Sequence, residues 1–151
     1  MSKEATLPTK VLILVNGTST DNDVVKIACN MTERTGGDIY AIYIIKLKRS
    51  LPLEAEVEPE IQKGESVLDH AERLAQEYDG NMETFLLQAR DKGPAIVEEA
   101  VEREVDLIIV GMSYEKPHGE FSIGDTVPYL LKWAPCRVLI YRESMPDEQE
   151  D

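Results

Sequence analysis

The chain has 151 residues, a length that fits one domain with its own hydrophobic core. Its formal net charge of -13 argues against nucleic acid and an anionic membrane surface as partners, because both are bound through clustered cations. Residues 1–9 are short and polar, and no apolar run approaches a membrane span, so we expect a cytoplasmic protein without a signal peptide. The two cysteines, Cys29 and Cys136, lack metal-ligand spacing, and we expect both to be reduced.

Two continuous apolar runs, residues 10–16 and 39–45, predict strands that are buried on both faces of a parallel sheet. The first run is followed by a predicted helix with Thr18, Thr20 or Asp21 as its capping residue. The apolar residues of this helix recur at helical spacing and are Val24, Ile27, Ala28 and Met31.

A different composition separates the second strand from the next helix. Residues 46–64 contain prolines and alternating glutamates, and few large apolar residues. We expect a long, mobile, solvated connection there, with recognition through the glutamates as the alternative. An amphipathic helix is predicted to follow over residues 65–78.

Residues 82–89 predict a third strand, which is less apolar than the first two and is therefore expected at a sheet edge. Asp91 is the expected cap of a third helix, and Pro94 fits its first turn, where an N–H is not needed. The residues of this helix expected to face inward are Ile96, Val97, Ala100 and Val101.

The last third of the chain predicts a fourth strand over residues 107–110, a helix over residues 125–133 and a final strand over residues 136–142. The apolar stripe of that helix is formed by Val127, Leu130, Leu131 and Ala134. Five strands and four helices in strict alternation predict a three-layer α/β fold with an open parallel sheet of Rossmann type. We expect one domain over residues 1–142 and a disordered acidic tail over residues 143–151.

The fourth strand ends at Gly111 and leads through a polar loop to Gly124 and the fourth helix. A strand that ends in glycine before a helix is a common place for phosphorylated ligands, because a helix N-terminus offers unpaired N–H groups and the positive end of a dipole. Each glycine has a structural alternative, which is to relieve a turn.

Several segments resemble the universal stress protein family. The first strand reads Val-Leu-Ile-Leu-Val-Asn-Gly-Thr over residues 11–18, and residues 106–111 read Asp-Leu-Ile-Ile-Val-Gly. Gly124 precedes the last helix, and residues 134–140 read Ala-Pro-Cys-Arg-Val-Leu-Ile, close to the final strand of the family. The resemblance implies the strand order 3-2-1-4-5, with a crevice at the carboxyl ends of strands one and four.

The family's ATP-binding branch has the pattern Gly-x2-Gly-x9-Gly-Ser/Thr. On this sequence the four positions fall on Gly111, Tyr114, Gly124 and Asp125, so the spacing is kept while two residue types differ. A tyrosine side chain obstructs the approach of backbone to phosphate, and a carboxylate at position 125 repels an anion. The sequence therefore predicts a degenerate ATP loop, which Thr126, together with the cations Lys116 and His118, could partly compensate.

The resemblance implies further ligand-binding residues at the ends of the strands. Asn16 replaces an aspartate that contacts adenosine, and its amide could still bind a ribose or base. Ile44 falls where the family packs an aliphatic residue on adenine, although a core position is an equal alternative. The remaining members of this expected site are Val15, Gly17, Thr18 and Val110.

Two functional hypotheses remain open for this stress-response or signalling module. In the first, ATP binding is weak or lost and the protein acts through an unidentified protein partner. In the second, the altered loop still holds a nucleotide such as ATP or AMP. An enzyme is not expected, because no nucleophile, base or metal cluster occurs at informative spacing. The apolar last strand, Cys136 to Arg142, is an expected sheet edge and predicts a homodimer through that edge.

Overall fold

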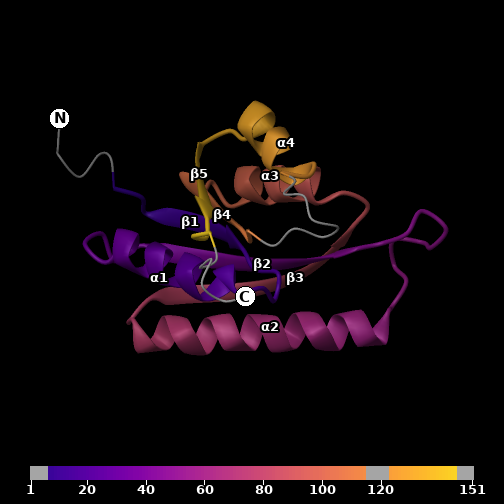
Figure 1. The fold of residues 1–151 in the computed structure, drawn as a ribbon, viewed down its shortest axis with the longest axis horizontal. Coiled ribbons are helices and arrows are strands. Elements are labelled where there is room, and N and C mark those ends of the chain that lie inside the picture. The colour runs from indigo at the N-terminus through magenta and orange to yellow at the C-terminus, as the bar shows by residue number, and fades with distance from the viewer. Residues whose placement is uncertain (1–6, 115–122, 146–151) are drawn as a thin grey trace.

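The computed structural model describes residues 7–114 and 123–145, and helices alternate with strands throughout these ranges (Figure 1). The strands are β1 (Lys10–Leu14), β2 (Asp38–Lys46), β3 (Asn81–Ala89), β4 (Leu107–Met112) and β5 (Arg137–Arg142). The helices are α1 (Thr20–Thr32), α2 (Glu58–Glu77), α3 (Lys92–Glu102) and α4 (Thr126–Trp133). The predicted alternation is confirmed.

The sheet is parallel throughout and has the order β3-β2-β1-β4-β5, as the resemblance implied. Helices α1 and α2 cover one face and α3 and α4 cover the other, which gives three layers (Figure 1). Strand β3 lies at an edge, as its weaker apolar character predicts. The chain leaves β1 in opposite directions toward β2 and β4, so a crevice forms between their carboxyl ends.

Strand β1 shows why its sequence is a continuous apolar run. Val11 and Ile13 belong to the core cluster under α1 and α2, whereas Leu12 and Leu14 belong to the cluster under α3 and α4. All four side chains are at most 4% exposed. Successive side chains of a strand point to opposite faces, so a central strand covered on both faces has no position for a polar residue.

Helix α2 begins at Glu58 rather than at residue 65, so the predicted solvated connection is wrong over its last third. Pro59 lies in the first turn, where no backbone N–H is needed, and Glu58 and Glu60 lie at the positive end of the helix dipole. Residues that suggest a loop by composition are thus suited to a helix start. Ile61, in this added part of the helix, packs against the core.

Two residues predicted to face inward are exposed. Val101 on α3 is 58% exposed and Leu131 on α4 is 65% exposed, so these two assignments are wrong. On α3 Glu99 is buried together with Ile96 and Ala100, and its carboxylate accepts the Nε–H of Arg103 at 2.9 Å. The Arg103 guanidinium in turn lies 3.5 Å from the centre of the Phe85 ring on β3. Pairing with a stacked arginine allows this carboxylate on the buried face of α3, where the apolar pattern did not place it.

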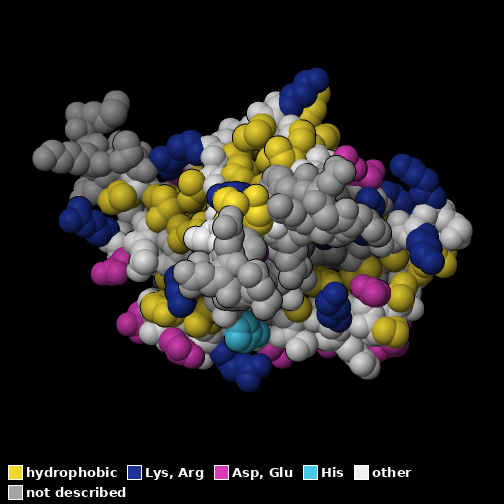
Figure 2. Space-filling view, in the orientation of Figure 1, with side chains coloured by type: hydrophobic (Ala, Val, Ile, Leu, Met, Phe, Trp, Pro, Cys, Tyr) yellow, Lys and Arg dark blue, Asp and Glu magenta, His cyan; other side chains and the backbone are white. Residues whose placement is uncertain are grey.

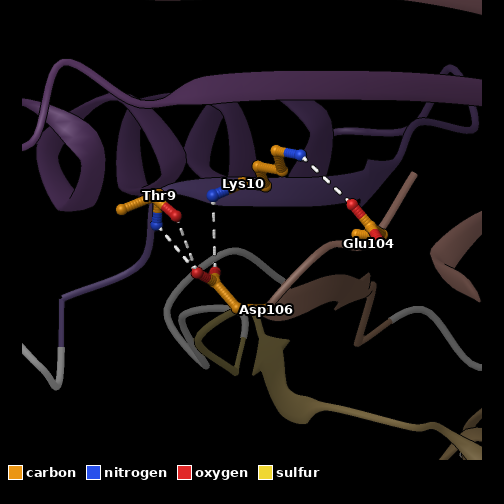
Figure 3. A network of polar contacts seen from close by, with 4 residues as sticks. All are labelled: Thr9, Lys10, Glu104 and Asp106. Atoms are coloured by element: carbon orange, nitrogen blue, oxygen red, sulfur yellow. Dashed lines mark hydrogen bonds and ion pairs between the residues drawn. The ribbon is translucent and has the colours of Figure 1, made fainter.

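Asp106 fastens the amino end of β4 to the amino end of β1 (Figure 3). Its carboxylate accepts the N–H and the hydroxyl of Thr9, each at 3.0 Å, and the N–H of Lys10 at 3.4 Å. Lys10 also forms an ion pair of 3.9 Å with Glu104. These contacts secure one end of the strand pair and leave the crevice at its other, carboxyl end.

Candidate functional site

A cavity of about 410 Å³ lies at the carboxyl ends of β1 and β4, where the strand order reverses. Its size suits a small organic ligand. The polar side chains that line it include those of Asn16, Thr18, Lys63, Lys92, Ser113 and Thr126. The structure thus brings together segments that are far apart in the chain, and we name this space the crevice cavity.

The loop between β1 and α1 is held by a carboxylate of the chain itself. Asp21 accepts the N–H of Asn16 at 3.1 Å and the N–H of Gly17 at 2.7 Å. Burial raises the pKa of Asp21 above its ordinary value, although the two N–H donors oppose this rise. The helix cap is Ser19, which makes no side-chain capping bond, so the predicted caps at 18, 20 and 21 are wrong. Asp21 instead closes the loop that presents Asn16 to the cavity.

Lys92 is one of two lysines that line the crevice cavity, and the sequence analysis did not identify it. Its Nζ donates to Asn16 Oδ1 at 3.3 Å, between the start of α3 and the end of β1. Burial, together with the positive charges of Lys46 and Lys63, lowers the pKa of Lys92. The only signal for it in the sequence is its place in the short connection after a strand, because such connections line the crevices of parallel sheets.

A second cavity of about 470 Å³ adjoins the first and shares Lys92 and Thr126 with it. Lys46, at the end of β2, and Asp125 also line this second space. Asp91, another lining residue, lies 4.0 Å from Arg49 in an exposed ion pair. The two cavities therefore lie side by side at the carboxyl edge of the sheet, and we refer to them together as the groove.

Gly111 lies inside β4 rather than at the start of the loop, since β4 continues to Met112 and pairs with β5 there. A Cβ atom at Gly111 would lie 2.8 Å from Thr20 Oγ1 and 2.9 Å from Val24 Cγ2. The glycine therefore permits close packing of α1 on β4. The space beside it also lines the crevice cavity.

The backbone N–H of Tyr114 is occupied within the chain. It donates at 2.7 Å to the carboxylate of Glu143, which also accepts the hydroxyls of Ser113 at 3.0 Å and Ser19 at 2.8 Å. These donors lower the pKa of Glu143, with the Tyr114 N–H as the largest cause. The Tyr114 ring lies 4.8 Å from the Arg142 guanidinium, and Tyr114 does not line either cavity. Glu143, which we assigned to the tail, is thus bound to the body of the domain.

The residues before α4 have distinct roles. Gly124 has a positive φ of 74°, and no atom lies within 4 Å of a Cβ built there, so backbone conformation is the reason for glycine. Asp125 is the N-cap residue of α4 but makes no side-chain capping bond. Thr126 borders both cavities. The predicted compensating cations Lys116 and His118 lie outside the described residues.

The other predicted site residues divide between the cavities and the core. Val110 lines the crevice cavity, and Gly17 has a positive φ of 81° in the loop after β1. Val15 is fully buried and Ile44 is 4% exposed, and both belong to the core clusters. Neither lines the two cavities.

Together these features define a class: an open, parallel α/β protein of Rossmann type with a ligand-sized crevice at its switch point. A model of the universal stress protein family matches residues 8–142, and the chain belongs to this family. The resemblance found in the sequence is confirmed. Within the ranges that the structure describes, no helix has the length and apolar character needed to cross a membrane.

Known proteins agree with this assignment. Universal stress protein MJ0531 from Methanocaldococcus jannaschii is 24% identical over 140 residues, which cover 89% of this chain and 82% of that protein. A solved universal stress protein from Archaeoglobus fulgidus in complex with dAMP has a TM-score of 0.70 at 15% identity, covering 89% of this chain and 98% of that one. An Arabidopsis thaliana family protein with AMP bound has a TM-score of 0.63 at 15% identity, covering 95% and 99%. At these identities the two solved structures show a shared fold.

Proposed function

We propose that this universal stress protein is a cytoplasmic, non-catalytic signalling module that binds an adenine nucleoside monophosphate in the crevice cavity and binds ATP weakly. The observation that carries the proposal is a difference between two parts of the site, the crevice cavity and the loop after β4. The crevice cavity is open and lined by Asn16, Lys63 and Lys92, while the Tyr114 N–H is already bound by Glu143. A nucleotide can enter the cavity, but an extended phosphate chain finds part of the loop occupied.

Charge also disfavours a triphosphate at the loop between β4 and α4. Asp125 precedes α4, where an anion would otherwise meet the positive end of the helix dipole. Glu143 adds a second carboxylate beside Tyr114. Two carboxylates near a triphosphate repel it, and the repulsion grows with the charge of the ligand.

The two ligand-bound relatives support a monophosphate. Their bound molecules, dAMP and AMP, both carry an adenine base and one phosphate. The crevice cavity has room for a ligand of this size. Asn16 lines it and carries both a donor and an acceptor for a ribose or base.

The lining of the crevice cavity supports binding rather than catalysis. Among the described residues that line it there is no histidine, cysteine or carboxylate. General acid–base catalysis depends most often on these groups, and a serine or threonine nucleophile is usually activated by an adjacent base. The lysines and hydroxyls that are present suit recognition of an anionic, hydrogen-bonding ligand.

Calorimetric titration of purified, nucleotide-stripped protein with adenosine, AMP and ATP tests this function. We expect AMP to bind at least tenfold more tightly than ATP. Asn16→Ala should weaken AMP, and Tyr114→Gly combined with Asp125→Ser should strengthen ATP. Tighter binding of ATP than of AMP by the unaltered protein, or no binding of either, would contradict the proposal.

We also propose a homodimer that forms through the β5 edge, Cys136 to Arg142. Strand β5 ends the sheet, and Leu131 and Trp133 on the adjoining α4 are 65% and 56% exposed. Figure 2 shows hydrophobic side chains gathered over α4 and β5. An uncovered apolar edge favours pairing with another chain, and a second copy would cover both features.

A further inference from the structure

The groove at the carboxyl edge of the sheet contains three lysines from three different elements. Lys46 ends β2, Lys63 lies in α2 and Lys92 begins α3. Lys63 and Lys92 line the crevice cavity, and Lys46 and Lys92 line the adjoining one. Positions so far apart in the chain meet here only because parallel strands place their carboxyl ends on one edge.

These lysines stand out against the charge of the whole protein, which is -13. No ion pair within the described residues involves Lys46, Lys63 or Lys92. The recorded acceptor of Lys92 is the neutral amide of Asn16, and its pKa is lowered by burial and by the other two lysines. Lys92 is partly buried, whereas Lys46 and Lys63 are exposed. A partly buried cation beside other cations is electrostatically unfavourable, and a bound anion reduces this cost.

We propose that Lys63 and Lys92 bind the phosphate group of the nucleotide, with Lys46 adding positive charge, in place of the N–H groups of the loop after β4. This inference rests on the proposed function and assigns the phosphate to a different part of the same groove. The crevice cavity suits the assignment, because its described lining contains two lysines and no carboxylate. A phosphate monoester accepts charge-assisted hydrogen bonds from both ammonium groups.

The remaining lining leaves room for the nucleoside. Met112 and Ile123 border the same cavity, and Ile123 is 53% exposed. An adenine base placed over these two side chains would remove apolar surface from water. Asn16, which accepts a hydrogen bond from Lys92, lies beside both the phosphate and the ribose in this arrangement.

The experiment compares adenosine with AMP by calorimetry, because the two ligands differ only in the phosphate. We expect AMP to bind more tightly than adenosine to the unaltered protein. Lys63→Gln and Lys92→Gln should each reduce the ratio of AMP affinity to adenosine affinity about tenfold, as loss of one charged hydrogen bond predicts. Lys92→Arg should keep the tighter binding of AMP relative to adenosine.

Two controls locate the phosphate. Lys132→Gln removes one positive charge from an exposed position on α4 and should leave AMP binding as it was. Ser113→Ala removes a hydroxyl at the start of the loop after β4. An AMP advantage that survives Lys63→Gln combined with Lys92→Gln, and is lost in Ser113→Ala, would overturn the lysine assignment while the proposed function stands.

Titration with inorganic phosphate distinguishes failure of the proposed function from failure of the lysine assignment. Absence of both adenosine and AMP binding would overturn the proposed function. In that event ³¹P NMR titration with inorganic phosphate decides the anion site alone. Line broadening with the unaltered protein that disappears in the Lys63→Gln, Lys92→Gln variant supports it, and no broadening with either protein overturns it.

Discussion

The carboxylate of Glu143 accepts the backbone N–H of Tyr114 at 2.7 Å, which joins the residue after β5 to the second residue after β4. Tyr114 stands where ATP-binding members of the family have their second glycine. A phosphate at that position would need the same N–H. Under the proposed function, the carboxylate of Glu143 takes the place that an external anion would otherwise have at this N–H.

Glu143→Gln should strengthen ATP binding roughly fivefold, because it removes one negative charge beside the loop and weakens the acceptor that holds the Tyr114 N–H. The measurement is calorimetric titration with ATP. Glu77→Gln, at the end of α2, makes the same change in net charge away from the groove and serves as the control. Equal ATP affinity in both variants would show that Glu143 does not compete with phosphate.

Gly111→Ala should lower the stability of the domain by about 1–3 kcal/mol, because the new methyl group overlaps Thr20 and Val24. In a chain of this length the melting temperature should fall by several degrees. Gly124→Asn is the matched control, since asparagine tolerates the positive φ and no atom lies within 4 Å of its Cβ. A stable Gly111→Ala protein would mean that α1 can move away from β4.

AMP affinity should fall as the pH rises through the pKa of Lys92, because the phosphate binds the charged form. This pKa is lowered, so the decline should begin at a lower pH than for an ordinary lysine. Calorimetry between pH 8 and roughly pH 10 avoids the second ionisation of the phosphate near pH 6. Lys92→Arg should flatten the profile, since a guanidinium stays charged throughout.

Other groups facing the groove could contribute to that profile. The titratable residues that line the same two cavities as Lys92 are Tyr43, Lys46, Lys63, Asp91, Asp125 and Tyr129. Lys46→Arg and Lys63→Arg separate their contributions. A profile that responds to these substitutions and not to Lys92→Arg would assign the titration to another lysine.

Leu131→Arg should convert the proposed dimer to a monomer. Leu131 is 65% exposed, so arginine there should not disturb the core, whereas Leu139 on β5 packs against the core and its substitution could unfold the chain. Analytical ultracentrifugation measures the mass, and the single tryptophan, Trp133, reports burial by its fluorescence. Val101→Arg, at an exposed valine on α3, is the control and should leave the mass unchanged.

Much of the fold follows from short-range pattern. The apolar run at the first strand predicts β1 because a strand covered on both faces admits only apolar side chains. The family motifs around Gly111 and Gly124 predict the crevice, and the structure has a cavity there. The start of α2 was missed because Pro59 and its neighbouring glutamates suit both a solvated loop and a first helical turn.

The sequence by itself determined the order of elements, the parallel sheet, the family and the place of the crevice, since each depends on local periodicity or on a contiguous motif. Only the tertiary structure decided which charged groups lie at that crevice. Lys46, Lys63 and Lys92 come from three elements, and Glu143 reaches Tyr114 across two adjacent strands. Such contacts have no signature along the chain, because they arise where the ends of parallel strands meet in space.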